Sequence, residues 1–340
     1  MIKKIYLFLL TTILTAGAAS AQNVDFHLNG MGFFDNREYK EFVTRSRTYS
    51  GVRITADVGF NIDSNNHFIF GANALHEFGG NPFFLRVNPV AYYSFTGKNW
   101  LFNAGAFSRE GLLTDYPRAM LNDTLRYYRP NVEGLLTRFK SDHVTETVWI
   151  DWVSRQTNVD REQFLFGFSG KYQPSLDGPF YVSHYFFLLH DAGPGIAIPD
   201  DHIQDNGAAQ IKLGANLSHK TFLDSLSFEA GGMLSLERSR GIDGWQKPKG
   251  FVASAYASYK RFALNDEFYK GDGHHVTFGD AYYQYKTYNR LDIIYTPFIA
   301  KGLKGQFVLS LHNTPGHFSN QEAFRLTFDI GRKNLVKFKD

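Results

Sequence analysis

The 340-residue sequence contains no cysteine and only 4 methionines. The lack of cysteine excludes disulfide bonds, thiol catalysis, zinc–thiolate sites and a lipid anchor on an N-terminal cysteine. The chain also lacks a large excess of charge. Its formal net charge of +3 gives no electrostatic reason to expect a nucleic acid as a partner. Apart from a short N-terminal run, no stretch is apolar for long enough to form a transmembrane helix.

The N-terminus has the three parts of a cleavable signal peptide. Lys3 and Lys4 supply the positive start, Ile5–Leu14 is an apolar run, and Ala19–Ala21 has the small-residue pattern that a signal peptidase recognises. The alternative is a membrane-anchoring helix, but the run is too short to span a bilayer and no stop-transfer flank follows it. We therefore expect residues 1–21 to be removed, which leaves Gln22 as the first residue.

The rest of the chain is rich in aromatic residues and has a recurring period of two. The 33 Phe, 19 Tyr and 4 Trp make up 16% of the sequence. In Val52–Asn61, apolar residues such as Ile54 alternate with polar residues such as Arg53, so the two kinds point to opposite faces of a strand. The same alternation occurs in Gln163–Tyr172, Gln210–Ser218, Ser225–Glu237 and Phe324–Ile330.

Alternation alone would also fit a soluble β-sandwich, but other features favour a membrane barrel. The strands run to about ten residues, whereas soluble strands usually stop at about five or six. The polar face carries Gly, Ser and charges of both signs, which suits a watery lumen, and the aromatic residues are typical of girdles at the membrane interfaces. We predict an all-β fold: one closed, antiparallel transmembrane β-barrel domain, residues 22–340, in the bacterial outer membrane.

Short turns alternate with longer loops, which is the outer-membrane arrangement with the short turns on the periplasmic side. Counting the segments between them predicts about 16 strands, with about 14 as the main alternative because single-chain barrels have even strand numbers. The predicted wall runs from Val24–Asp35 to Glu322–Gly331. Longer loops are expected near residues 36–47, 110–130, 190–206, 239–249, 270–284 and 313–319. Three segments alternate poorly and leave the count open: Asn131–Lys140, Phe180–His190 and Phe262–Lys270.

Several short segments also have counterparts in a known family. They are the end of the signal peptide at Ala19–Gln22, the run Tyr127–Gly134, and Ile150–Trp152 followed by Arg161–Phe164. On these segments, and loosely over the whole mature chain, the sequence resembles the porin-like outer-membrane β-barrels of Bacteroidota. It departs from many outer-membrane proteins at its C-terminus, where a charged tail, Arg332–Asp340, follows the last strand. The resemblance implies a channel, and porins of this strand number are often homotrimers.

The loop Glu110–Pro130 is the most informative one for function. In porins, the loop at the corresponding place folds into the pore and narrows it. A charged loop inside a lumen would set an electrostatic constriction. The alternative is a surface loop with ordinary solvated charges. The candidate constriction residues are Asp115, Arg118, Asp123, Arg126 and Arg129.

The polar faces of the predicted strands supply further candidates that would face the lumen. Charges enclosed in a barrel have to pair with one another or be hydrated. The candidates are Arg53, Asp57, Arg86, Asp151, Arg155, Glu229, Asp292 and Arg325. They could line a pore or simply cross-link a filled interior, and both possibilities predict the same alternation.

We find no arrangement of residues that is diagnostic of catalysis, and we expect no metal or cofactor. The favoured function is therefore a porin-like channel for passive diffusion of small hydrophilic solutes, not an enzyme. The alternative is a non-conducting barrel that displays loops for binding or modifies lipids as an outer-membrane enzyme. The expected partners are outer-membrane lipids and lipopolysaccharide together with the solutes.

Overall fold

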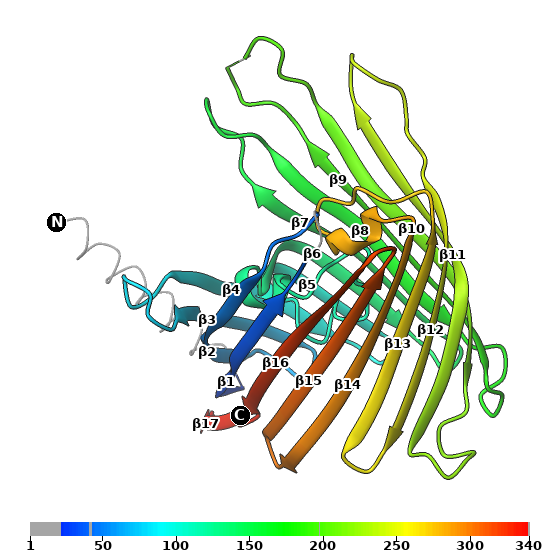
Figure 1. Cartoon of the computed structure of the whole chain (residues 1–340). Coiled ribbons are helices and arrows are strands. Elements are labelled where there is room, and N and C mark those ends of the chain that lie inside the picture. Colours follow the sequence, from blue (N-terminus) through cyan, green and yellow to red (C-terminus); the bar gives the residue numbers. More distant parts are fainter. Residues whose placement is uncertain (1–21, 41–42, 197, 339–340) are drawn as a thin grey trace.

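The strands of the computed structural model stand side by side in a tilted ring (Figure 1). The structure describes residues 22–40, 43–196 and 198–338, so the predicted signal peptide at 1–21 lies outside the described residues. The elements are β1 (Asn23–Glu38), β2 (Arg47–Asn61), β3 (Asn66–Glu77), β4 (Arg86–Thr96), β5 (Trp100–Ser108), α2 (Leu125–Tyr128), β6 (Asn131–Lys140), β7 (Val144–Ser154), β8 (Gln163–Tyr172), β9 (Phe180–Asp191), β10 (Gln204–Asn216), β11 (Ser225–Ser239), β12 (Lys249–Tyr259), β13 (Phe262–Gly271), η1 (Ala281–Gln284), β14 (Thr287–Ala300), β15 (Leu303–Thr314), β16 (His317–Asp329) and β17 (Lys333–Lys337).

The ring is closed because the first strand pairs with both the second and the last. Each strand pairs antiparallel with its sequence neighbours, and β1 pairs with β2 along one edge and with β16 along the other. The short β17 pairs with the beginning of β1, Asn23–Phe26, on the same edge of β1 that β16 pairs with further along. The predicted closed antiparallel barrel of 16 strands is thus confirmed, and the alternative of 14 strands is wrong.

The two ends of the barrel differ in their connections. Both chain ends of the ring and the tight turns, such as Gly302 between β14 and β15, lie at one end, which is the periplasmic end of an outer-membrane barrel. The longer loops lie at the other. One predicted loop is wrong: at 313–319 the chain forms a tight turn, because Gly316 has a positive φ of 88° and lets β15 and β16 pair up to their ends. Two further outer loops, 78–85 and 155–162, were not predicted.

The outer face of the wall is apolar and the inner face is polar. On β2, Ile54 is 42% exposed on the outside, while Arg53 is 4% exposed on the inside. This is the alternation of a barrel that faces lipid with one side and its own interior with the other. The chain is accordingly placed in the bacterial outer membrane. None of the helices in the described residues has the length and hydropathy of a transmembrane span.

The interior of the barrel is filled largely by two loops from the extracellular end, residues 109–130 and 272–286. Their side chains form one hydrophobic cluster with inward-facing residues of the wall, including Leu136 on β6 and Phe187 on β9. This packing explains why Asn131–Lys140 and Phe180–His190 alternate poorly in the sequence. Their inner faces are apolar because they contact the loops rather than water. In Figure 1, η1 lies within the outline of the ring.

Close packing of the wall generates a prediction at two neighbouring glycines of β11. A Cβ on Gly231 would lie 1.9 Å from the carbonyl oxygen of Ile211, whereas a Cβ on Gly232 would have its nearest neighbour 3.9 Å away. Gly231→Ala should therefore destabilise the barrel by about 1–3 kcal/mol, because the backbone of β10 must shift. Gly232→Ala, the matched control, should change stability by less than about 0.5 kcal/mol. Urea unfolding in lipid vesicles measures both, and equal midpoints for the two variants would contradict the close approach.

Candidate functional site inside the barrel

The loop 109–130 is held in the barrel by apolar packing and by one buried tyrosine. Leu113, Tyr116 and Met120 are all buried in the central cluster. The Tyr116 hydroxyl donates a hydrogen bond to the Phe186 carbonyl oxygen at 2.9 Å and accepts one from the Trp149 ring nitrogen at 2.8 Å. The loop therefore lies against the wall formed by β7–β9 as well as inside the ring.

The second loop, 272–286, meets the first one at its far side. The backbone N–H of Asn122 donates to the Phe278 carbonyl at 2.8 Å, and that of Asp280 donates to the Arg118 carbonyl at 2.9 Å. These main-chain bonds join two segments that are far apart in the sequence. The two loops consequently form one plug inside the barrel.

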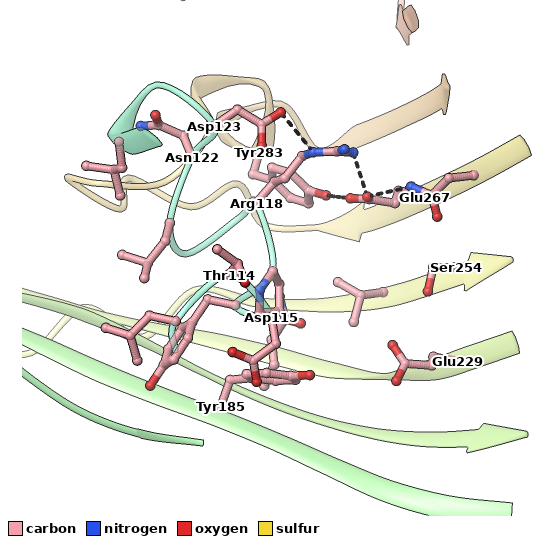
Figure 2. A pocket seen from close by; sticks show the side chains of 18 of the residues that line it. Thr114, Asp115, Arg118, Asn122, Asp123, Tyr185, Glu229, Ser254, Glu267 and Tyr283 are labelled. Atoms are coloured by element: carbon pink, nitrogen blue, oxygen red, sulfur yellow. Dashed lines mark hydrogen bonds and ion pairs between the residues drawn. The ribbon is translucent and has the colours of Figure 1, made fainter. Parts of the chain in front are cut away.

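A network of buried charges fastens this plug to the opposite wall. Arg118 lies 2.7 Å from Glu267 and 3.3 Å from Asp123, measured between nitrogen and carboxylate oxygen (Figure 2). Arg118 also lies 2.9 Å from a carboxylate oxygen of Asp292. Asp123 in turn lies 3.8 Å from both Arg290 and Arg325. The network thus connects the loop with β13, β14 and β16.

The network also keeps Asp123 ionised. Burial raises the pKa of this carboxyl group, but the guanidinium groups of Arg118, Arg325 and Arg290 more than offset that effect and hold the pKa well below its usual range. Because the partners neutralise one another, the charges can be buried inside the barrel.

A cavity of about 340 Å³ remains between the loop 109–130 and the wall formed by β9–β13. Figure 2 shows Asp115 and Tyr185 on one side of this cavity and Glu229 facing them. Lys212 forms an ion pair with Glu229. Burial raises the pKa of Asp115, so this carboxyl group takes up a proton more readily than an exposed aspartate. Cavities with such shifted groups are candidate binding sites for polar ligands.

The structure brings most of the residues singled out in the sequence to the inside of the ring, in several separate groups. Asp115, Arg118, Asp123 and Arg126 line the cavity together with Glu229 and Arg325, and Asp292 binds Arg118 behind it. Asp57 pairs with Arg332, and Asp151 pairs with Arg109. Arg129 donates to the Val153 carbonyl, Arg86 to the Tyr128 carbonyl, and Arg53 to Asn73.

Arg155 is the exception among these residues. It is exposed in the extracellular loop after β7 and does not face the lumen. The prediction extended the alternation of β7 too far. The register of β7 on β8 shifts between Trp152 and Ser154, and the strand ends at Ser154.

A group of aromatic residues around His312 was missed by sequence reasoning. His312 on β15 is fully buried, its Nδ1 lies 2.7 Å from the Tyr288 hydroxyl, and Tyr282 of η1 stacks on its ring at a centroid distance of 4.5 Å. Its Nε2 has no hydrogen-bond partner in the described part of the chain. Ser319 on β16 is the residue directly opposite His312 in the strand pairing. These residues come from two strand pairs and a loop, so no local motif could have shown them.

Fold and interior together define a porin-like outer-membrane β-barrel whose interior is occupied by its own loops. A sequence model for the lipid A 3'-O-deacylase-type family matches residues 16–331. The chain belongs to this family. No curated protein sequence matches it.

Solved outer-membrane barrels share the fold at low sequence identity. The anion-selective porin from Comamonas acidovorans has a TM-score of 0.59 at 11% identity, with 90% of this chain and 100% of that chain covered. A loop L8 deletion mutant of OmpT, an outer membrane protein of Vibrio cholerae, has a TM-score of 0.57 at 10% identity over 90% and 98% of the two chains. The outer membrane protein opdK from Pseudomonas aeruginosa has a TM-score of 0.54 at 8% identity over 92% and 100%.

The family match corrects one prediction from the sequence. The expectation that the protein is not an enzyme is wrong, because the family is named for an enzyme and points to enzymatic activity. The search for catalytic motifs failed since it relied on residues close together in the sequence, whereas the inner wall of a barrel brings together residues from distant strands.

The charge network yields a prediction about the plug. Arg118→Met would leave Glu267, Asp292 and Asp123 without their shared cation, so it should destabilise the protein by about 3–5 kcal/mol. Arg126→Met is the matched control in the same loop. The ion pair of Arg126 with the exposed Glu110 is long, at 4.0 Å. Arg126→Met should therefore lower the free energy of unfolding by less than about 0.5 kcal/mol.

Urea unfolding and limited proteolysis of the loop 109–130 would measure both effects. Faster cleavage is expected for Arg118→Met alone. The same stability and the same cleavage rate for both variants would show that the network does not hold the plug.

Proposed function

We propose that the protein is an outer-membrane hydrolase that removes an ester-linked acyl chain from lipid A. The observation that carries this proposal is the family match over nearly the whole chain. The barrel places the protein in the membrane that contains lipid A. The interior is filled by loops, and this arrangement suits a protein that holds an enclosed site better than it suits a wide pore.

The group around His312 offers the chemistry. Side chains directly opposite each other on neighbouring strands have Cβ atoms about 4.5–5.5 Å apart, so the Ser319 hydroxyl can approach the His312 ring. In the tautomer whose Nδ1–H donates to the Tyr288 hydroxyl, the lone pair on Nε2 is available as a base. Both residues lie in the extracellular half of their strands, on the side of the outer leaflet.

In the proposed reaction, His312 accepts the proton of Ser319 while the serine oxygen attacks the ester carbonyl carbon. The sugar hydroxyl leaves and takes that proton from His312, which gives an acyl-serine. A water molecule, deprotonated by the same imidazole, then releases the fatty acid and restores the serine. Tyr282 covers His312, so the loop 272–286 has to move aside before lipid can reach the site, as lids do in other enzymes.

A second candidate function is the restricted diffusion channel. It is supported by the polar cavity beside the loop 109–130, which is lined by charges of both signs. In that case the charges of Asp115, Arg118 and Asp123 would select among passing ions. The resemblance to porins, whose corresponding loop narrows the pore, implies the same role.

To test the hydrolase proposal, the purified full-length protein is incubated with lipid A in mixed micelles. The masses of the products are then measured by mass spectrometry. The wild type should release one fatty acid per lipid. His312→Gln and Ser319→Ala should each lower the rate by about 100-fold or more, because the first removes the base and the second removes the nucleophile. His275→Gln, an exposed histidine in the covering loop, is the control and should retain the wild-type rate. Intact lipid A after prolonged incubation with the wild type would end the proposal.

The channel is tested by planar-bilayer recordings in a salt gradient. The wild type should give discrete conductance steps, and Asp115→Asn should shift the reversal potential toward anion preference, because a carboxylate is removed from the cavity. Asp160→Asn, in an extracellular loop, serves as the control. The absence of conductance steps at any voltage would rule the channel out.

A further inference from the structure

The barrel wall is incomplete in its extracellular half beside β4. The pairing of β3 with β4 continues up to Leu75 and Arg86, but the pairing of β4 with β5 stops at Ala91 and Ala106. In the described part of the chain, the first five residues of β4, 86–90, therefore have no partner strand on the β5 side. Pro89, within this stretch, has no N–H to offer a neighbour.

Side chains replace missing main-chain bonds at this gap and at a second gap, between β6 and β7. The Asn131 side-chain amide donates to the Pro89 carbonyl at 2.9 Å. At the β6–β7 seam, where the strand pairing ends at Gly134 and Asp151, the Asp151 carboxylate accepts from the backbone N–H of Glu133 at 2.9 Å. Arg129 donates to the Val153 carbonyl there at 2.8 Å. This part of the wall is therefore held by polar side chains rather than by a continuous ladder.

Four arginines, Arg53, Arg86, Arg109 and Arg129, gather at this place, and we call them the arginine group. Arg86 donates to the Tyr128 carbonyl at 3.0 Å, and Arg109 donates to the Arg129 carbonyl at 3.2 Å, so three of them meet at one short segment. Arg53 is opposite Leu75, which is opposite Arg86, so Arg53 and Arg86 lie in one row on the inner face.

The positive charge of the arginine group is largely uncompensated. Among the described residues, Asp151 on Arg109 is the one carboxylate within ion-pair distance of any of the four. Arg53 is 4% exposed, yet its Nε and Nη2 have no hydrogen-bond partner among residues 22–40, 43–196 and 198–338. Arg109 is 6% exposed, and its Nη1 has no partner in the same residues. A buried guanidinium without an anion is costly. Burial lowers the pKa of Arg129, and Arg109 and Arg86 lower it further, although Asp151 and Glu133 partly offset them.

The surroundings of the arginine group are apolar on the membrane side. The loop 78–85 that leads into Arg86 carries exposed Phe78, Phe83 and Phe84, the second of them 65% exposed, and Val87 and Trp152 are exposed on the neighbouring outer wall. An aromatic band beside arginines at the extracellular rim is the arrangement in which acyl chains contact the rings and an anionic headgroup contacts the guanidinium groups.

We propose that the arginine group binds the phosphate group of a phosphorylated outer-leaflet lipid, with its acyl chains against the loop 78–85. This inference rests on the proposed function, since it assigns the part of lipid A that the site recognises. The unpartnered nitrogens of Arg53 and Arg109 and the exposed guanidinium of Arg86 supply the donors. A phosphate bound there would also balance the positive charge that Asp151 on Arg109 leaves uncompensated.

The test measures binding without turnover, using full-length protein that carries His312→Gln. Native mass spectrometry in detergent micelles would compare lipid A, lipid A stripped of its phosphates, phosphatidic acid, diacylglycerol and inorganic phosphate. Each phosphorylated lipid should bind about 10-fold tighter or more than its phosphate-free counterpart, which corresponds to about 1.4 kcal/mol. Arg86→Gln should reduce that preference to about threefold or less. Arg155→Gln, which changes an exposed arginine of the extracellular loop after β7 outside the arginine group, should retain it.

Equal binding of lipids with and without phosphate, or an unchanged preference in Arg86→Gln, would overturn the inference. Inorganic phosphate at millimolar concentration could compete with the lipids, and the lipids could bind no tighter than phosphate alone. That result would assign the site to free phosphate and overturn the claim that it binds a lipid. Deacylation by the wild type is measured separately. If it fails while the phosphate preference persists, the proposed function is lost and the binding site stands. If deacylation succeeds but no phosphate preference is found, the proposed function stands and the phosphate-binding site is lost.

Discussion

The hydrogen bonding of the backbone in lipid is the constraint on which the whole structure depends. No water reaches the hydrocarbon region, so every strand must have a partner on both edges, and a ring is the arrangement of strands that provides this. Here the ring is closed by β1, which pairs with β2 on one edge and with β16 and β17 on the other. Closure fixes the alternation of inner and outer residues along every strand. It also creates an interior that the chain must fill, hydrate or line with paired charges.

The interior is filled by loops, and this decides what kind of protein the barrel can be. Aromatic residues such as Tyr116 and Tyr282 occupy space that would otherwise hold water, while Arg118 and Asp123 tie the loops to the wall. Each of these charges is tolerable inside because its partners are close. The polar cavity beside Asp115 and the buried group at His312 are what remains between loop and wall. A barrel of this size can thus have the fold of a porin and still offer enclosed sites, which fits the membership in an enzyme family.

Much of the fold could be predicted from the sequence because period-two alternation is a local signal. Ile54 and Arg53 reveal the two faces of β2 without any knowledge of its neighbours. The prediction failed where a local signal was misleading: the inner face of β9 is apolar because it contacts a loop, and Arg155 follows an irregularity in β7. The site was harder to predict. Arg118 and Asp123 could be named as residues of an informative loop, but His312, Tyr288 and Ser319 are brought together by strand pairing, which a single sequence does not specify.

The place where the main-chain pairing of the ring is interrupted is the most informative part of the wall. Evenly paired strands need no side chains to hold them together. Here the main-chain ladder is replaced by Asn131 beside Pro89, and by Asp151 and Arg129 between β6 and β7. Such a substitution keeps the backbone satisfied but leaves several guanidinium groups together at the extracellular rim. A barrel that only had to span the membrane would gain nothing from concentrating positive charge there, since burying it is costly. An anionic group that arrives from the outer leaflet would remove that cost, and its binding energy would be available to position a lipid beside the barrel.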